Sequence, residues 1–289
     1  MIARRFLLGA LLFLAACDGA GQVASNEEPP SPALWEIETA SGQRGWVFGT
    51  IHSLPGGQAW RTARLDGALG DAQLLVLEVA ELDDAAAMRA TYAQLATTPG
   101  LAAPSARVTP SEAPAVRAAL ARAGLEEADL TSLETWAVAL SLSNAAGPPG
   151  ESVDRQLLAE WGERPLAGLE TIAGQLGIFD TLAPEEQAEL LVSVVEETRE
   201  ADERQALADA WRSGDMAALE ALTRQGMLAR PALREALLDR RNHAWAARIV
   251  PLLAAGRAPF VAVGAGHVVG AQGLPALLAA RGLAVRRLQ

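Results

Sequence analysis

The chain has 289 residues, 50% of them hydrophobic, which is enough to build one large domain or two closely packed halves. Its formal net charge of −11 at pH 7 repels polyanions, so nucleic acid is excluded as a partner. The single cysteine, Cys17, ends an N-terminal apolar run. Disulfides, thiolate catalysis and zinc–cysteine sites are therefore excluded from the folded part.

The N-terminus has the pattern of a secretory signal. Two arginines precede the apolar run 6–16, which is too short for a permanent membrane span. Its end, Leu14-Ala15-Ala16-Cys17, resembles the lipobox of bacterial lipoproteins. We expect residues 1–17 to be the signal peptide and an acylated Cys17 to anchor the protein, facing the periplasm, in the cell envelope. The alternative is an ordinary signal peptide with an unrelated cysteine. Asp18 favours the inner membrane, although the choice between the two membranes stays open.

Residues 18–33 are polar and proline-rich, so we expect a flexible tether before a single domain over 34–289. Alternation of apolar and polar residues, with a turn at 41–43, predicts a hairpin, and continuous apolar runs predict buried strands of a parallel or mixed sheet. The predicted strands are 34–38, 44–49, 73–79, 164–170, 260–263 and 283–288.

Helices are predicted from capping boxes at Thr109 and Thr131 and from apolar periodicity elsewhere. The predicted helices are 60–69, 84–96, 110–124, 131–144, 152–161, 171–176, 184–210, 216–225, 231–255 and 274–281. The Gly-Pro-Pro-Gly segment 147–150 is the best boundary between two halves of the domain.

Two of the three histidines occupy the same setting, a Gly-x-x-His segment directly after a strand. His52 follows the strand 44–49, and His267 follows the strand 260–263. Two further strands end in a carboxylate, Glu78 and Glu170, in the position where open α/β sheets bind ligands. We therefore expect the two halves to bring two histidines and two glutamates to one cleft.

Neutral imidazole and carboxylate side chains form a suitable coordination shell for a divalent metal such as zinc, manganese or cobalt. A metal with open positions can activate water, and a spare glutamate can take the proton. The simpler interpretation of each histidine alone is a structural hydrogen bond at a strand end.

The chain resembles the TraB/GumN family, which includes the Tiki proteins. The matching segments extend from Trp35 almost to the C-terminus: Trp35 with Ile37, Gly49–His52, Leu77-Glu78, Val153-Asp154, Gly168–Thr171 with Gln175, Arg241-Asn242, and Val263–His267 followed by Gly270 and Gly273-Leu274. The resemblance implies an α/β fold with a pseudo-symmetric pair of small mixed β-sheets surrounded by helices. This architecture is similar to that of erythromycin esterase-like and haem-binding ChaN-like proteins.

The resemblance also implies roles for particular residues. His52 and His267 match the two motif histidines, Glu78 the glutamate after the first motif, and Glu170 the glutamate of the Gly-Leu-Glu-Thr segment. We expect His52, His267 and Glu170 to hold a metal, with Glu78 as the general base. The resemblance to Tiki proteins implies protease activity.

Three other residues have two interpretations each. Asp154 either favours the helix dipole or orients a site histidine. Arg241 and Asn242 either bind a substrate carboxylate or fix a helix to the sheet.

Three functions remain open. The first is an envelope-anchored, metal-dependent hydrolase that cleaves an amide or ester bond. The second is a metal-independent hydrolase in which one histidine, oriented by a carboxylate, is the general base. The third is a binding protein that holds haem or a peptide without turnover.

Overall fold

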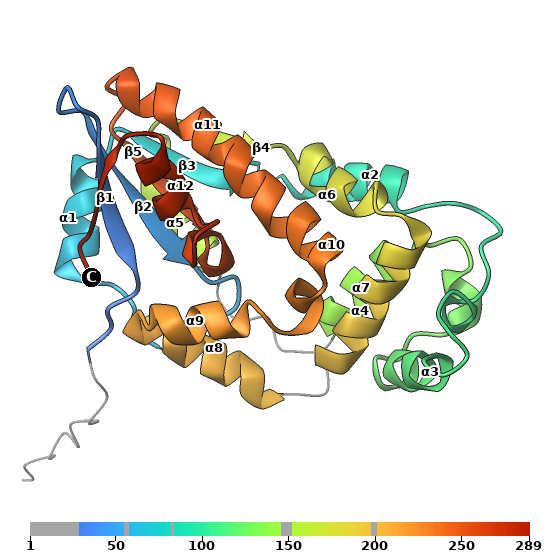
Figure 1. The fold of residues 1–289 in the computed structure, drawn as a ribbon. Coiled ribbons are helices and arrows are strands. Elements are labelled where there is room, and N and C mark those ends of the chain that lie inside the picture. The colour runs from blue at the N-terminus through green and yellow to red at the C-terminus, as the bar shows by residue number, and fades with distance from the viewer. Residues whose placement is uncertain (1–28, 55–57, 82–83, 146–151, 198–200) are drawn as a thin grey trace, which may run out of the picture.

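The computed structural model describes residues 29–54, 58–81, 84–145, 152–197 and 201–289 (Figure 1). Within them, six strands form one mixed sheet in the order β4-β3-β5-β2-β1-β6. The strands are β1 (Leu34–Glu38), β2 (Arg44–Thr50), β3 (Leu74–Val79), β4 (Leu166–Glu170), β5 (Pro259–Gly264) and β6 (Ala284–Arg287). The prediction of an α/β fold is confirmed.

The expected pair of small sheets is wrong for the described residues, because all the strands share one sheet. The reason is the position of β5, which comes from the C-terminal part of the chain but lies between β2 and β3. The two parts of the sequence are thus joined through the centre of the sheet. The proposed boundary at 147–150 lies outside the described residues.

The centre of the sheet is parallel, and its other edge is antiparallel. Strands β2, β5, β3 and β4 run in the same direction, so their C-terminal ends meet at one edge. The predicted hairpin of β1 and β2 is confirmed, and β6 pairs with β1 in antiparallel fashion. All six side chains of β3 are buried, as the continuous apolar run predicts for a strand covered on both faces.

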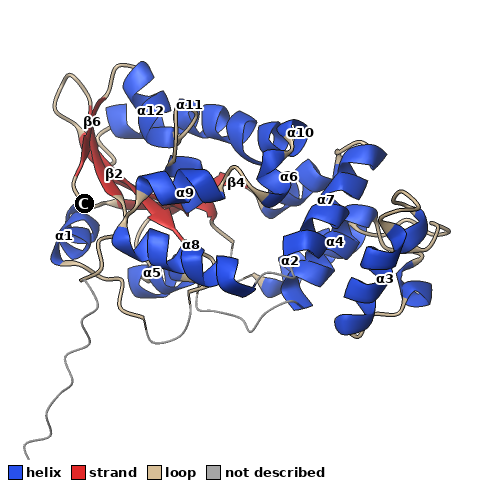
Figure 2. Ribbon diagram, turned by 60° about the horizontal axis from the view of Figure 1, so that its bottom comes forward, coloured by secondary structure: helices blue, strands red, loops and turns tan. Residues whose placement is uncertain are grey.

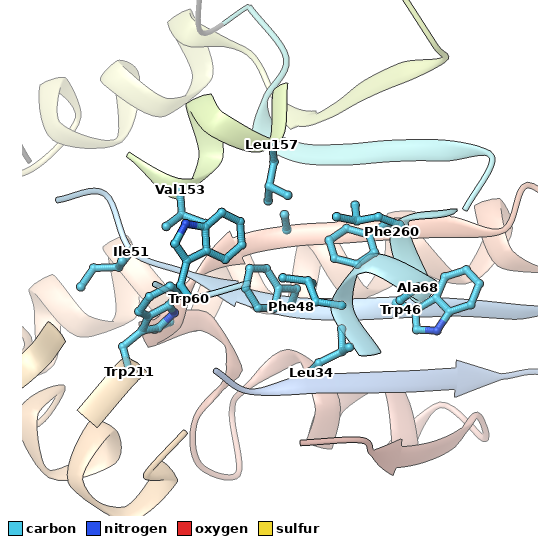
Figure 3. Close-up of a cluster of buried hydrophobic side chains, with 14 of the residues drawn as sticks. Leu34, Trp46, Phe48, Ile51, Trp60, Ala68, Val153, Leu157, Trp211 and Phe260 are labelled. Carbon is cyan, nitrogen blue, oxygen red and sulfur yellow. The ribbon is translucent and has the colours of Figure 1, made fainter. Parts of the chain in front are cut away.

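Helices cover both faces of the sheet, which gives three layers (Figure 2). One face packs against α1, α5, α8 and α9, and Figure 3 shows the aromatic centre of this core, where Phe48 contacts the rings of Trp60, Trp211 and Phe260. The other face packs against α11 and α12. These helices are α1 (Ala63–Asp71), α5 (Val153–Trp161), α8 (Ala201–Ser213), α9 (Met216–Leu222), α11 (Arg240–Ala254) and α12 (Leu274–Ala280).

The remaining helices form a lobe beside the β4 edge, with a core of its own around Trp136 (Figure 1). They are α2 (Ala85–Leu95), α3 (Ala113–Arg122), α4 (Thr135–Ala145), α6 (Ile172–Asp180), α7 (Pro184–Glu197) and α10 (Pro231–Arg234). A π-helical turn, Glu235–Asp239, joins α10 to α11, so the predicted helix 231–255 is nearly continuous. None of the described helices combines the length and the hydropathy that a bilayer span requires.

Several predicted helix boundaries are wrong. Helix α3 begins at Ala113 instead of 110, because Glu112 accepts hydrogen bonds from Thr109 and holds residues 109–112 as a turn. Helix α4 begins at Thr135 instead of 131, because the Thr131 hydroxyl donates to the Ala128 carbonyl and caps no helix. The predicted helix 184–210 is two helices, α7 and α8.

The segment predicted as a tether ends earlier than expected. The Ser31 N–H donates to the Arg212 carbonyl, and Gln289 donates to the Pro32 carbonyl, so these residues are already part of the domain. The rest of the tether, residues 18–28, and the predicted lipidation site Cys17 lie outside the described residues.

Candidate functional site

The two Gly-x-x-His segments leave the sheet side by side. Strand β2 pairs with β5 so that Thr50 lies opposite Gly264, which places the following turns next to each other. Gly49 permits this packing, because a Cβ at that position would lie only 3.0 Å from the Val268 side chain. The segments that are far apart in sequence therefore share the C-terminal edge of the parallel strands, as predicted.

His52 is held through its Nδ1 atom. This atom lies 3.0 Å from Oδ2 of Asp154, a buried residue in the first turn of α5. The other oxygen, Oδ1, accepts a hydrogen bond of 2.7 Å from the Thr50 hydroxyl. The Val153 N–H donates to the Ile51 carbonyl and fixes the start of α5 beside the histidine. Because the His52 side chain is 69% exposed, its Nε2 atom remains accessible.

The carboxylate of Asp154 determines the protonation of His52. The hydrogen bond with Asp154, supported by the negative charges of Asp154 and Glu78, raises the pKa of His52 to about 9. The imidazolium form therefore predominates at pH 7, and the neutral form is a strong base. Of the two interpretations of Asp154, the geometry supports the one in which it orients a histidine.

His267 is buried in the 3₁₀ turn Ala265–Val268 and is held on three sides. Its Nδ1 lies 2.6 Å from Oδ1 of Asn242, which can only accept, so Nδ1 carries the proton. Its Nε2 then accepts from Arg241 at 3.2 Å. The ring packs against Trp245 with a centroid distance of 4.3 Å. Burial lowers the pKa of His267 strongly, so this imidazole is neutral.

Glu78 lies between the two histidines at the end of β3. Its Oε1 accepts the Gly264 N–H at 2.8 Å, and its Oε2 accepts from Arg241 at 2.8 Å and from Gln175 at 3.3 Å. Burial alone raises the pKa of Glu78, but its electrostatic interactions with His267, Arg241 and His52 outweigh burial and lower it. Glu78 is therefore an ionised, hydrogen-bonded carboxylate.

Arg241 is the centre of the cluster. Its Nε and Nη2 groups donate hydrogen bonds to the two oxygens of the Glu170 carboxylate, and Nη2 also donates to Glu78. Its Nη1 group donates to the Leu237 carbonyl and to His267. An arginine has five N–H donors, so these contacts use all of them. The geometry therefore favours a positioning role for Arg241 over direct binding of a substrate carboxylate.

Asn242 and Glu170 are also held by the protein itself. Asn242 is fully buried, and its amide donates to the Gln272 carbonyl while its oxygen faces His267. Burial raises the pKa of Glu170, against the opposing effect of its hydrogen bonds with Arg241. Both residues shape the cluster instead of presenting free groups to it.

Three site residues lie close to Cα of Gly264, on the side where another amino acid would carry its side chain. A Cβ on Gly264 would lie 3.3 Å from Oε1 of Glu78, 3.4 Å from Nε2 of His52 and 3.9 Å from Cδ2 of His267. Any side chain here would enter the space between the reactive groups. Because Gly264 has no side chain, His52 and Glu78 can approach the same point beside it.

The donor set does not fit the predicted metal. Nε2 of His267 and Oε2 of Glu78 already accept from Arg241, and both Glu170 oxygens do the same. A fixed guanidinium charge in this position opposes a second cation. In the part of the chain that the structure describes, no group of three or more His, Cys, Asp or Glu side chains is arranged to hold a metal ion.

Some residues of the cluster were missed by sequence reasoning. Thr50 holds Asp154, and Trp245 contacts both His267 and Arg241, whose guanidinium carbon lies 4.5 Å from the indole centroid. The signal for Trp245 is its position one helical turn after Arg241. Thr50 lies two residues before His52, but a strand pattern does not reveal its partner.

The fold and the site define a class: a three-layer α/β protein with a histidine–carboxylate–arginine cluster at the C-terminal ends of its parallel strands. The chain belongs to the TraB/PrgY/gumN family, whose model matches residues 33–287. The predicted family is thereby confirmed. Searches of curated proteins and of solved structures give no match.

Proposed function

We propose that the protein is a hydrolase of amide or ester bonds that activates water with His52 and requires no metal. The observation that carries this proposal is the convergence of His52 Nε2 and Glu78 Oε1 on the open side of Gly264. A water molecule there is within hydrogen-bonding reach of a base and of an anchoring carboxylate.

His52 is a better general base than Glu78. Its Nε2 is exposed to substrate, while Asp154 holds Nδ1 and stabilises the imidazolium that forms. Both oxygens of Glu78 accept hydrogen bonds from the protein, and its pKa is lowered, so it attracts a proton weakly. Glu78 therefore orients the water, and His52 removes its proton.

The reaction then needs only the groups of the chain. Neutral His52 takes one proton from the water while the water oxygen attacks the carbonyl carbon of the substrate. The resulting imidazolium, paired with Asp154, gives that proton to the leaving amine or alcohol when the bond to it breaks. Arg241 holds Glu78 in the position from which it orients the water.

The predicted anchor gives this hydrolase its location. An acylated Cys17 followed by the segment up to residue 30 would hold the domain close to the periplasmic face of a bacterial membrane. Mass spectrometry of the N-terminal peptide from membranes tests this part. An unmodified Cys17 in the membrane fraction would refute it.

The experiment uses purified protein that has been treated with a chelator and assayed on panels of chromogenic esters and peptide amides. We expect hydrolysis that survives the chelator and falls by about 10²–10⁴ in His52→Gln. The matched control is His243→Gln, which removes an exposed histidine hydrogen-bonded to Gln272.

Two results would contradict the proposal. Activity that disappears with the chelator and returns with manganese, cobalt or zinc would support the metal-dependent reaction. Rates of hydrolysis that stay at the uncatalysed level for both wild type and His52→Gln on every substrate would leave a binding function.

A further inference from the structure

A pocket of about 280 Å³ lies directly beside the cluster, between the end of β4, helix α6, the start of α7 and helix α11. Helix α11 lines it with Arg241, Ala244, Trp245 and Arg248, whose spacing of i, i+3, i+4 and i+7 places them on one helix face. Arg241, which lines this pocket, also donates to Glu78, so one residue connects the pocket with the proposed catalytic groups.

Half of the residues that line the pocket are apolar: Leu169, Ile178, Leu182, Ala236, Ala244 and Trp245. Such a lining suits one branched or aromatic side chain of modest size.

One arginine at the pocket has no carboxylate partner among the described residues. Arg241 is shared between Glu170 and Glu78. Arg248 donates through Nη1 to the Leu169 carbonyl, but no carboxylate lies within ion-pair distance of it among the described residues. Arg240 meets only the distant Glu235 oxygen at 3.7 Å, and both side chains are more than half exposed.

The remaining acidic residue of the lining, Glu186, accepts the Ala183 N–H at the start of α7 through its Oε2 and is not within ion-pair distance of Arg248. Arg248 therefore offers N–H donors to an anion from outside. A planar guanidinium matches a carboxylate with two parallel hydrogen bonds, which makes a carboxylate the best-suited anion.

We propose that this pocket binds the terminal carboxylate and apolar side chain of the substrate, such as the C-terminal residue of a peptide. Arg248 is the recognition residue, with Arg240 adding charge at the rim. The inference rests on the proposed hydrolase, since it assigns the pocket as the subsite for one end of the cleaved molecule. It predicts that substrates with a free carboxylate are preferred over their amides.

Binding can be tested without turnover. N-acetyl-leucine and N-acetyl-leucinamide, which differ only in the carboxylate, are titrated into the protein and followed by NMR. We expect saturable binding of the acid, at least about tenfold weaker binding of the amide, and loss of this difference in Arg248→Gln. Added salt should weaken the binding of the acid, because the guanidinium is exposed.

Two controls separate this inference from the proposed function. Arg122→Gln removes an exposed arginine at the end of α3 and should leave binding unchanged. His52→Gln should also retain binding, so a failure of hydrolysis alone does not affect the result. Equal affinity for acid and amide, or unchanged binding of the acid in Arg248→Gln, would overturn the carboxylate subsite.

Discussion

At the residue scale, the two histidines of the cluster differ in which ring nitrogen is occupied. Asp154 contacts Nδ1 of His52 and Asn242 contacts Nδ1 of His267, but Nε2 of His267 also accepts from Arg241, whereas Nε2 of His52 has no hydrogen-bond partner among the described residues. The two Gly-x-x-His segments look equivalent in the sequence, but their histidines have different environments in the structure. His52 is exposed and basic, while His267 is buried, neutral and part of the support.

The pairing of His52 with Asp154 predicts a pH dependence. Hydrolysis needs the neutral imidazole, so the rate should increase from pH 7, reach half of its maximum near pH 9 and level off above that. In Asp154→Asn the loss of the hydrogen bond and the charge should lower the pKa of His52 toward 6.5 and move the rise in rate to lower pH.

NMR titration of the imidazole protons measures the pKa of His52 directly, and His243→Gln simplifies the assignment. The variant Thr50→Val removes only the hydrogen bond that Thr50 donates to Asp154, so it should shift the pKa of His52 less than Asp154→Asn does. A His52 pKa that does not change in Asp154→Asn would refute the assigned pairing.

Gly264 gives a second prediction at this scale. The change Gly264→Ala should abolish most activity, because the new methyl group lies 3.3 Å from Glu78 Oε1 and 3.4 Å from His52 Nε2. The backbone φ of −51° is normal for alanine, so the fold should remain. The comparison is Gly67→Ala in α1, where a Cβ meets nothing within 4 Å.

Activity and thermal unfolding of both variants check this prediction. Gly67→Ala should keep full activity and gain about 0.5–1 kcal/mol of stability, as expected for alanine in a helix interior. Full activity in Gly264→Ala would show that the space beside Gly264 holds no reacting water.

At the element scale, the sequence predicted the parts better than their arrangement. The strand ends at Glu78, Glu170 and the two Gly-x-x-His segments were found from apolar runs and glycines. The register that sets Thr50 beside Gly264 depends on pairing between distant strands, which local patterns do not contain. For the same reason, the position of β5 in the middle of a single sheet was missed.

The predicted helix starts are wrong where a local side-chain contact replaces the capping of the helix. The sequences at Thr109 and Thr131 both match a capping box, but the Thr131 hydroxyl donates to a preceding carbonyl. By contrast, Ser152 and Asp84 do cap α5 and α2 through their side chains. The capping motif alone does not distinguish these cases.

Helix α11 connects the cluster to the sheet through Arg241, which gives a stability prediction. The change Arg241→Gln leaves Glu78 and Glu170 as buried carboxylates without their shared cation. We expect a loss of about 3–5 kcal/mol in the free energy of unfolding at pH 7, as for a broken buried ion pair. Urea unfolding measures it.

The double variant Arg241→Gln with Glu170→Gln should be more stable than Arg241→Gln alone, since it also removes one unpaired charge. Arg240→Gln, next to it in α11 but exposed, should change stability by no more than about 0.5 kcal/mol. If Arg241→Gln behaved like Arg240→Gln, the central role of Arg241 would be wrong.

At the scale of the whole molecule, three layers place a polar cluster at the C-terminal ends of buried central strands. Strands β2, β3 and β5 are covered by the cores around Phe48 and around Trp245. The charged groups therefore have few partners apart from one another, and their protonation is linked to folding.

This linkage predicts a stability maximum near pH 6.5. The folded-state pKa of His52 is raised to about 9, so its contribution is complete below the unfolded value of 6.5 and is lost as the pH rises through about 9. The folded-state pKa values of His267 and Glu78 are lowered. The contribution of His267 is complete above 6.5, that of Glu78 above 4.5, and both are lost in acid.

Urea unfolding between pH 4 and pH 10 measures the curve, and variants assign its two sides. Asp154→Asn should flatten the alkaline side, because His52 then titrates at similar pH in the folded and unfolded states. His267→Asn should reduce the slope below pH 6.5, since no buried imidazole must then be protonated. If each variant changed the opposite side, or neither changed its own side, the assigned protonation states would be incorrect.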